Sequence, residues 1–297
     1  MVLTKRIKEK AALPIFTSAG KRGNMTITME LICIGNELLI GKVVNTNASW
    51  MGKRATALGV AVRRVTESPD EIPEIVNVVR EALARKPNFI VTSGGLGPTF
   101  DDMTLEGLAK ALNLGLIVND EALDMIKAKY KEYSKLRNIP EGEMTPYRVK
   151  MATLPIGACP IFNPVGSAPG VRIDVDGTVL IALPGVPSEM EAIFADYIVP
   201  LLIESSGGVG FFEMSIYTNK IMESALAPLI DKVMLDNPAV YIKSHPKGRE
   251  NRPHELHLST TGKSEETPAE RLRKASLELV ELVKKSGGEV IKAETMT

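Results

Sequence analysis

The sequence has few of the residues from which disulfide or metal-held frameworks are built. Its 297 residues include two cysteines, Cys33 and Cys159, which form neither a metal-ligand spacing nor a disulfide framework. Such cysteine usage is typical of a reducing compartment, so we expect a cytoplasmic protein. No run of apolar residues is long enough to cross a bilayer, which argues against a membrane partner.

The sequence also lacks an excess of charge of either sign. Lysine plus arginine and aspartate plus glutamate both number 36, so no global field attracts the chain to nucleic acid or to an acidic membrane surface. Any charged partner must be recognised locally. We therefore expect a phosphorylated small molecule, in particular a nucleotide-sugar diphosphate, and we do not expect nucleic acid.

Residues 1–25 differ in composition from the rest of the chain, because they carry six basic residues and a single acid, Glu9. A signal peptide is one interpretation, since a short apolar patch follows the first charges. Pro14, Thr17 and Ser18 interrupt that patch, and no small-residue cleavage site is present. We therefore expect a disordered leader, with Met25 a candidate start of the folded chain.

From Ile27 onward, short β-branched runs alternate with longer segments of helical period. This pattern predicts repeated βα units around a largely parallel sheet, which is an α/β fold. The predicted strands are 29–34, 60–65, 89–92, 171–175 and 179–183, and the predicted helices are 47–58, 71–85, 105–112, 120–136 and 188–203. The chain length favours two domains over one.

Small residues at 205–208 mark the expected boundary between these domains, with a large domain at 26–206 and a small one at 207–297. The small domain reads as strand, helix, strand, strand, helix, strand, at 211–218, 222–235, 240–243, 256–260, 268–285 and 289–292. This βαββαβ order predicts a ferredoxin-like α+β domain.

Residues 93–99, Ser-Gly-Gly-Leu-Gly-Pro-Thr, follow a buried-strand pattern and precede a helix. Glycines allow backbone N–H groups to approach an anion, and a helix N-terminus adds positive partial charge, so this segment is a candidate phosphate site. The alternative is a tight turn that needs positive φ angles. The candidate binding residues here are Ser93, Gly94, Gly95, Gly97 and Thr99.

Two adjacent carboxylates, Asp101 and Asp102, follow this segment directly. They would repel a phosphate unless a cation lay between them, and Mg²⁺ is typically held by one or two carboxylates together with phosphate oxygens. We therefore predict a divalent metal, Mg, Mn or Co, held by Asp101 and Asp102. The alternative is that Asp102 caps the helix that begins near Thr104.

Two further clusters follow predicted strands. Open α/β sheets bind ligands at the carboxyl ends of their strands, so both clusters are candidate parts of the same pocket. In the first cluster Glu37 is a candidate catalytic residue, while Asn47 has the alternative role of a helix N-cap. The candidate ligand contacts in the two clusters are Asn36, Asn45, Asn47, Ser167, Pro184, Gly185 and Glu189.

The small domain contains a cationic segment, in which Lys243, His245 and Lys247 are candidate phosphate contacts. The segment is either a solvated connection between strands or an element that reaches over the pocket. We assign the three histidines of the chain, His245, His254 and His257, to loops and strands rather than to a metal triad.

Several separated motifs together closely resemble the CinA family. They are Gly35-Asn-Glu-Leu-Leu39, Asn45-Thr-Asn47, residues 93–99 with Asp101, Asp102 and Thr104, Asn163-Pro-Val-Gly-Ser-Ala-Pro-Gly170, Leu183-Pro-Gly-Val-Pro-Ser-Glu-Met190 and Tyr241-Ile-Lys-Ser-His-Pro-Lys-Gly248. The amino-terminal domain of that family is similar to molybdopterin-binding proteins of the MoaB/MogA type. The resemblance implies a three-layer α/β/α sandwich and a homo-oligomer.

Members of the family are associated with metal-dependent hydrolysis of ADP-ribose, and bacterial relatives add a nicotinamide mononucleotide deamidase domain. Because this sequence ends at Thr297, we expect it to lack that domain. The resemblance therefore implies a hydrolase of the ADP-ribose pyrophosphatase type, which gives AMP and ribose 5-phosphate. Asp101 and Asp102 would then hold the metal, and Glu37 would orient or deprotonate water.

Two alternatives remain open for the same residues. The first is molybdopterin or nucleotide binding, or adenylyl transfer, in molybdenum cofactor biosynthesis. The second is non-catalytic binding of a metabolite, or of RNA through the small domain, where residues 207–210 spell the Gly-x-x-Gly pattern of KH domains. These residues precede a predicted strand instead of joining two helices, which argues against RNA.

Overall fold

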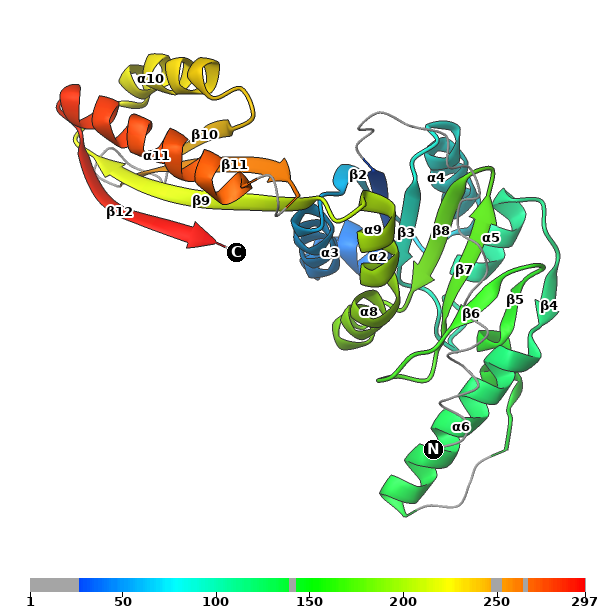
Figure 1. Ribbon diagram of the computed structural model, residues 1–297. Helices are drawn as coiled ribbons and strands as arrows, with labels where there is room; N and C mark the ends of the chain where they lie inside the picture. Colours follow the sequence, from blue (N-terminus) through cyan, green and yellow to red (C-terminus); the bar gives the residue numbers. More distant parts are fainter. Residues whose placement is uncertain (1–26, 139–142, 247–252, 264–266, 297) are drawn as a thin grey trace.

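The computed structural model describes residues 27–138, 143–246, 253–263 and 267–296, and the leader predicted at 1–25 lies outside these ranges. The described residues form two α/β units, each with its own sheet (Figure 1). The chain passes from the first unit to the second between α9 (Val199–Ser206) and β9 (Gly210–Asn219).

The large unit is built on a six-stranded sheet with the order β2-β1-β3-β8-β7-β6. Neighbouring strands from β2 to β8 pair in parallel, whereas β7 pairs antiparallel with both β8 and β6. The prediction of a mostly parallel sheet is confirmed. The strands are β1 (Thr28–Ile34), β2 (Ala61–Ser68), β3 (Phe89–Ser93), β6 (Cys159–Ile161), β7 (Gly170–Val175) and β8 (Thr178–Leu183).

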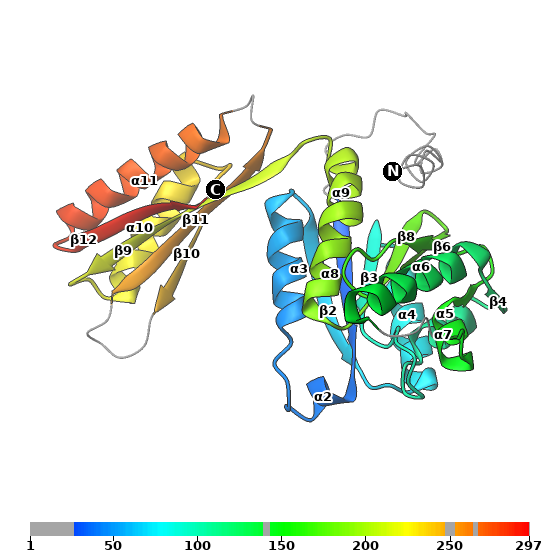
Figure 2. The same ribbon diagram turned by 90° about the horizontal axis from the view of Figure 1, so that it is seen from below.

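Helices cover both faces of this sheet, so the predicted three-layer sandwich is confirmed (Figure 2). Every residue of β3 and β8 is buried, as expected for central strands packed on both sides. One face packs on α4 (Ile72–Ala84), α5 (Thr104–Ala111), α6 (Asp120–Arg137) and α7 (Pro146–Met151). The other face packs on α3 (Thr46–Ala57), α8 (Pro187–Ile193), the π-helical turn η1 (Phe194–Ile198) and α9.

The expected regular succession of βα units fails at β7, which forms a hairpin with β8. Asp176 and Gly177 connect the two strands with φ angles of 47° and 86°, and positive φ at both positions is what a two-residue hairpin turn requires. Because β7 runs against β8, β7 begins at the edge where β8 ends. The segment before Gly170 is thereby brought to the carboxyl edge of the sheet.

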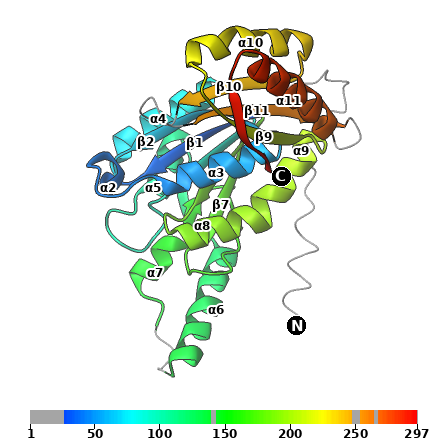
Figure 3. The same ribbon diagram turned by 90° about the vertical axis from the view of Figure 1, so that its left-hand side faces the viewer.

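The periodicity also missed several short elements: α2 (Asn36–Leu39), α7, β6 and the two-stranded sheet of β4 (Leu116–Val118) and β5 (Thr153–Pro155). The helix predicted at 188–203 is interrupted by η1. Pro200 has no N–H for a bond to the carbonyl four residues earlier, which explains the local change of helix type. Helix α6 extends away from the body of the large unit (Figure 3).

The small unit is an antiparallel sheet with the order β10-β11-β9-β12. Its elements are β9, α10 (Glu223–Asp236), β10 (Tyr241–Pro246), β11 (His254–Gly262), α11 (Pro268–Lys285) and β12 (Glu289–Met296). The order of elements is βαββαβ, and both helices contribute to one apolar core. The predicted ferredoxin-like α+β fold is confirmed.

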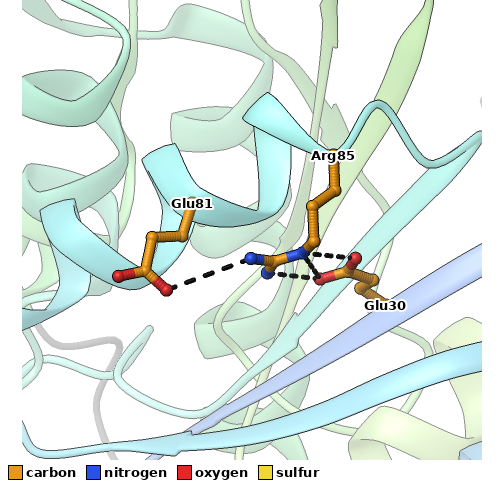
Figure 4. Close-up of polar contacts among 3 residues, drawn as sticks. All are labelled: Glu30, Glu81 and Arg85. Carbon is orange, nitrogen blue, oxygen red and sulfur yellow. Dashed lines mark hydrogen bonds and ion pairs between the residues drawn. The ribbon is translucent and has the colours of Figure 1, made fainter.

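An ion pair between the half-buried Arg85, which follows α4, and the buried Glu30 of β1 ties these two elements together (Figure 4). The Nε and Nη2 groups of Arg85 donate to Glu30 Oε1 at 2.8 Å and to Glu30 Oε2 at 2.7 Å. The Glu30 side chain is only 4% exposed. Its charge therefore depends on the guanidinium for compensation.

Candidate functional site

A cleft opens at the carboxyl edge of the large sheet, where three parallel strands end side by side. Cys33 is in register with Ser93, and Ser93 is in register with Leu183. The segments that follow these strands, together with the one before β7, enclose a cavity of about 380 Å³. Its wall includes Gly35, Glu37, Asp70, residues 94–99, Asp101, Asp102, Ser167, Pro184, Gly185 and Glu189.

The floor of the cleft is the backbone of residues 94–97. Gly94 has a φ of 110°, and a Cβ at this position would lie 2.1 Å from the carbonyl oxygen of Ile34. The turn therefore needs a glycine, as the alternative interpretation held. The Gly94 N–H donates to Leu183 O at 3.0 Å, and the buried Thr104 hydroxyl donates to Gly94 O at 2.8 Å. These bonds hold the backbone of this turn in place at the border of the cleft.

Thr99 gathers the two neighbouring carboxylates at one side of the cleft. Its hydroxyl contacts Asp101 Oδ1 and lies 2.6 Å from Asp102 Oδ2, and its N–H donates to Asp102 Oδ2 at 2.7 Å. The Thr99 hydroxyl, with a smaller contribution from Lys150, lowers the pKa of Asp101. The alternative role of Asp102 as a helix cap is wrong, because α5 begins after Met103 without a side-chain cap.

Two further carboxylates make the cleft acidic. Asp70, directly beyond β2, accepts a hydrogen bond of 2.8 Å from the backbone N–H of Asn36. Burial and the nearby charges of Glu37, Asp101 and Asp102 raise the pKa of Asp70, against the lowering effect of that hydrogen bond. All four carboxylates line the same cleft.

Asn47 joins two strand ends instead of capping α3. Its amide Nδ2 donates to Ser93 Oγ at 2.9 Å and to Gly185 O at 2.8 Å, so the cap interpretation is wrong. The cap is Asn45, whose Oδ1 accepts from Ala48 N at 2.9 Å. Among the described residues, the cleft wall does not include Asn36, Asn45, Asn47 or Ser93; they support its loops from behind.

Asn163 shapes the wall that carries Ser167. Its Oδ1 accepts from the N–H groups of Val165 and Gly166 at 3.0 and 2.8 Å. Its Nδ2 donates to Ala168 O at 2.8 Å and to Glu189 Oε2 at 2.7 Å. These bonds fix the segment before β7 against the first turn of α8. Pro187 opens that helix and Glu189 lies in its first turn, as predicted.

The predicted contacts from the small domain do not reach this cleft within the described chain. Lys243 and His245 lie on β10, and neither lines the cleft. In register they face His257 and Glu255 of β11, which pair with Ser215 and Tyr217 of β9. Ser215 and Tyr217 lie five and seven residues beyond Gly210, where β9 begins, which at about 3.3 Å per residue separates these positions from the domain junction by roughly 17 to 23 Å of strand. Lys247 lies outside the described residues.

Sequence reasoning missed three residues of the site: Asp70, Lys150 and Asn163. Asp70 carried a usable signal, because it follows a strand at the same edge as the glycine segment. The predicted strand ended at Val65, whereas β2 continues to Ser68. Lys150 comes from α7, a short helix without a clear period, and its ammonium group donates to the Thr99 carbonyl. No local pattern predicts that contact.

The cleft offers oxygen ligands but no ready-made metal cage. Within the described ranges, no group of three or more His, Cys, Asp or Glu side chains is arranged to hold an ion. The Thr99 hydroxyl lies between both carboxylates, while the Thr99 N–H donates to Asp102 and Lys150 lies near Asp101. Two carboxylates completed by ligand phosphate and water match the usual coordination of Mg²⁺.

None of the described helices is both long and apolar enough to cross a bilayer.

Comparison with known proteins identifies a matching family model and several related chains. Residues 30–204 match the family model of the Probable molybdopterin binding domain. The chain is 43% identical over 262 residues to protein PAE0875 of Pyrobaculum aerophilum, which covers 87% of this chain and 95% of that protein. It is 45% identical over 261 residues to protein SSO0103 of Saccharolobus solfataricus, which covers 87% and 93%.

Among solved structures, the chain is similar to CinA of Thermoplasma acidophilum, with 44% identity and a TM-score of 0.52. This match covers 58% of the present chain and 96% of the solved one. The cleft lies within the segment matched by the family model, residues 30–204, since every residue of its wall falls between 34 and 189.

Proposed function

Because this chain belongs to the family of the Probable molybdopterin binding domain, we propose that its cleft binds a phosphorylated heterocyclic small molecule, either a molybdopterin or a nucleotide. The similarity to CinA and the domain match confirm the resemblance found in the motifs. The phosphate would lie on the backbone of residues 94–97, and the pterin or base would extend beyond it.

The backbone that lines the cleft at the strand ends carries this proposal. Residues 94–97 border the cleft, and the positive φ angles of Gly94 and Gly95 turn the chain there. The Gly94 N–H already donates to Leu183 O, so the N–H groups of residues 95–97, near the first turn of α5, would be the donors for phosphate oxygens. The cleft lies at the carboxyl ends of β1, β3 and β8, where open α/β sheets bind their ligands.

A divalent cation reconciles a phosphate with the four carboxylates around it. Asp101 and Asp102 would hold the ion, with ligand oxygens completing its coordination. When bound, it would supply neutralisation of phosphate charge and a lowered pKa for a coordinated water. Asp70 and Glu37 would add negative potential that stabilises the cation-bound form of the cleft over its metal-free form.

Adenylyl transfer is the reaction that fits a molybdopterin ligand: a phosphate oxygen of the ligand attacks the α-phosphorus of a nucleoside triphosphate, and diphosphate leaves. Asn47, Asn163 and Thr104 would keep the cleft segments in place during this step. The chain's own contribution would be positioning and charge compensation, which supply most of the acceleration in phosphoryl-type transfers.

Hydrolysis of ADP-ribose is the second candidate, favoured by the exposed carboxylate of Glu37, which lines the same cleft as Asp101 and Asp102. Water would attack one phosphorus, the bridging P–O bond would break, and AMP and ribose 5-phosphate would leave. Glu37 would accept the proton of the attacking water. A binding protein without turnover is the remaining alternative.

Release of AMP from ADP-ribose tests hydrolysis, with the purified chain and magnesium, manganese or cobalt. Transfer is tested with ATP and a pterin phosphate by following diphosphate release. The Asp101→Ala and Asp102→Ala variants should lose metal-dependent product, and Asp124→Ala, an exposed carboxylate on α6, should keep it. If the phosphorylated ligand binds but no product forms, the result supports binding and contradicts both reactions. Absence of both binding and product would refute the proposed function.

Self-association also remains a prediction. Light scattering behind a sizing column would measure it directly, and a monomer at micromolar concentration would contradict it.

A further inference from the structure

A second cavity adjoins the cleft along residues 95–97. It has a volume of about 630 Å³, which is ample for a bicyclic ring. Its wall is mainly apolar and comes from the α5 and α7 regions and from β4. The apolar wall residues are Leu96, Phe100, Met103, Leu105, Leu116, Met144, Pro146 and Val149.

We propose that this cavity binds the planar heterocycle of the ligand whose phosphate lies in the cleft, the heterocycle being a purine or a pterin. The inference rests on the proposed function and adds to it the position of the ring. Small-molecule sites are typically concave and largely apolar, with a few polar groups that fix orientation. The cavity between α5, α7 and residues 95–97 has this composition.

The two cavities share a wall, so one ligand can extend across both. Gly95, Leu96, Gly97 and Asp102 line the cleft and the second cavity alike. A Cβ at Gly97 would lie 2.6 Å from Asp102 Oδ2. The ridge between the cavities is therefore only a backbone with a carboxylate against it, and a nucleoside monophosphate or pterin phosphate is long enough to cross it.

Phe100 supplies a face on which a ring can stack. It borders the cavity, and it is 84% exposed. Packing does not require a phenylalanine there, because so little of the ring is buried. Aromatic side chains that stack on bases contribute about five- to 150-fold in affinity.

The polar groups of the cavity suit the edges of such a ring. Lys150 can donate hydrogen bonds, Glu106 can accept them and Thr153 can do both, and all three line the wall. Glu106 also pairs with Lys110 at 2.9 Å, which holds it at the surface of α5. Ring nitrogens and exocyclic amino groups of purines and pterins present the complementary donors and acceptors.

Calorimetric titration of AMP and of ribose 5-phosphate, both with saturating magnesium, measures the contribution of the ring to binding affinity. The two ligands share the sugar phosphate and differ by the base. We expect AMP to bind at least about tenfold tighter than ribose 5-phosphate. A titration with neopterin monophosphate shows whether a pterin gains the same or a larger advantage, which identifies the preferred ring.

Two variants of the cavity make the test specific. Phe100→Ala removes the stacking face without disturbing the core, and Val149→Trp fills the cavity. Both should reduce the advantage of the ring phosphates, with little change for ribose 5-phosphate. The matched control is Leu235→Ala, which changes an apolar residue on α10 that is 81% exposed.

Each outcome supports or overturns the inference. An advantage of either ring phosphate that both variants reduce supports it. Equal binding of all three phosphates, or an advantage that survives in both variants, overturns the ring position while the phosphate site stands. Failure of all three phosphates to bind overturns the proposed function and the inference with it. None of these readings requires turnover, so an inactive protein can be tested equally well.

Discussion

Removing the guanidinium of Arg85 should strongly destabilise the large unit without changing its ligand chemistry. In the Arg85→Met variant the hydrogen bonds of 2.8 and 2.7 Å to Glu30 are lost, and methionine retains most of the aliphatic stem. The Glu30 carboxylate, 4% exposed, is then left without a cation. Breaking a buried pair in this way typically costs about 3–5 kcal/mol.

The loss translates into a measurable shift. For a chain of this size each kcal/mol corresponds to roughly 2–4 °C in Tm, so the expected fall is about 6–20 °C. Urea unfolding followed by circular dichroism measures the free energy directly. The control is Glu81→Gln: Glu81 is 72% exposed and lies 3.9 Å from Arg85, so its removal should change stability by less than about 0.5 kcal/mol.

Two results would contradict this reasoning. A loss below about 1 kcal/mol for Arg85→Met would mean that Glu30 is hydrated or finds another partner. Failure of Glu30→Gln to restore stability in the Arg85→Met background would mean that the buried charge is not the cause. Ligand affinity per folded molecule should be unchanged, because Glu30 lies near the start of β1 and the cleft lies beyond its end.

The other predictions concern the cleft itself. Burial and neighbouring charges raise the pKa of Asp70, so the contribution of Asp70 to stability should fall as pH rises above the unfolded value of about 4. In metal-free buffer, Asp70→Asn should therefore raise Tm more at pH 7 than at pH 4, and an equal change at both would contradict it. Asn47→Ala removes two hydrogen bonds and should lower the unfolding free energy by about 1–3 kcal/mol in urea. Gly97→Ala places a Cβ 2.6 Å from Asp102 Oδ2 and should weaken Mn²⁺ binding, measured by electron paramagnetic resonance, by about tenfold or more; unchanged binding would place the ion elsewhere.

Much of the large sheet could be predicted from local pattern, for a physical reason. Central strands such as 89–93 and 178–183 are buried on both faces, so they read as continuous apolar runs bounded by turn residues. The helices with strong apolar periods were predicted within one or two residues of their observed ends. The hairpin of β7 and β8 was missed although its Asp-Gly turn is visible in the sequence, because the regular βα alternation suggested a parallel strand.

The site was only partly predictable, because its contacts are long-range. The glycine segment and Asp101 follow one strand and could be found together. The bond from Asn47 to Gly185 joins residues 138 positions apart, and the contact from Lys150 to Thr99 joins residues 51 positions apart. The side chain of Asn47 suggested a local role as a helix cap, and that of Lys150 suggested no role. Only the strand order brings these residues together.

The acid content of the cleft bears on which functions the fold can support. At an effective dielectric of about 20 and a separation of about 6 Å, one carboxylate repels one phosphate charge by roughly 3 kcal/mol. Glu37, Asp70, Asp101 and Asp102 all line the cleft, so a phosphate bound without a cation would face several such terms. A protein that bound phosphorylated ligands without a cation would gain nothing from these side chains. The arrangement therefore favours a cation-dependent site, in which phosphate affinity falls steeply when the metal is chelated.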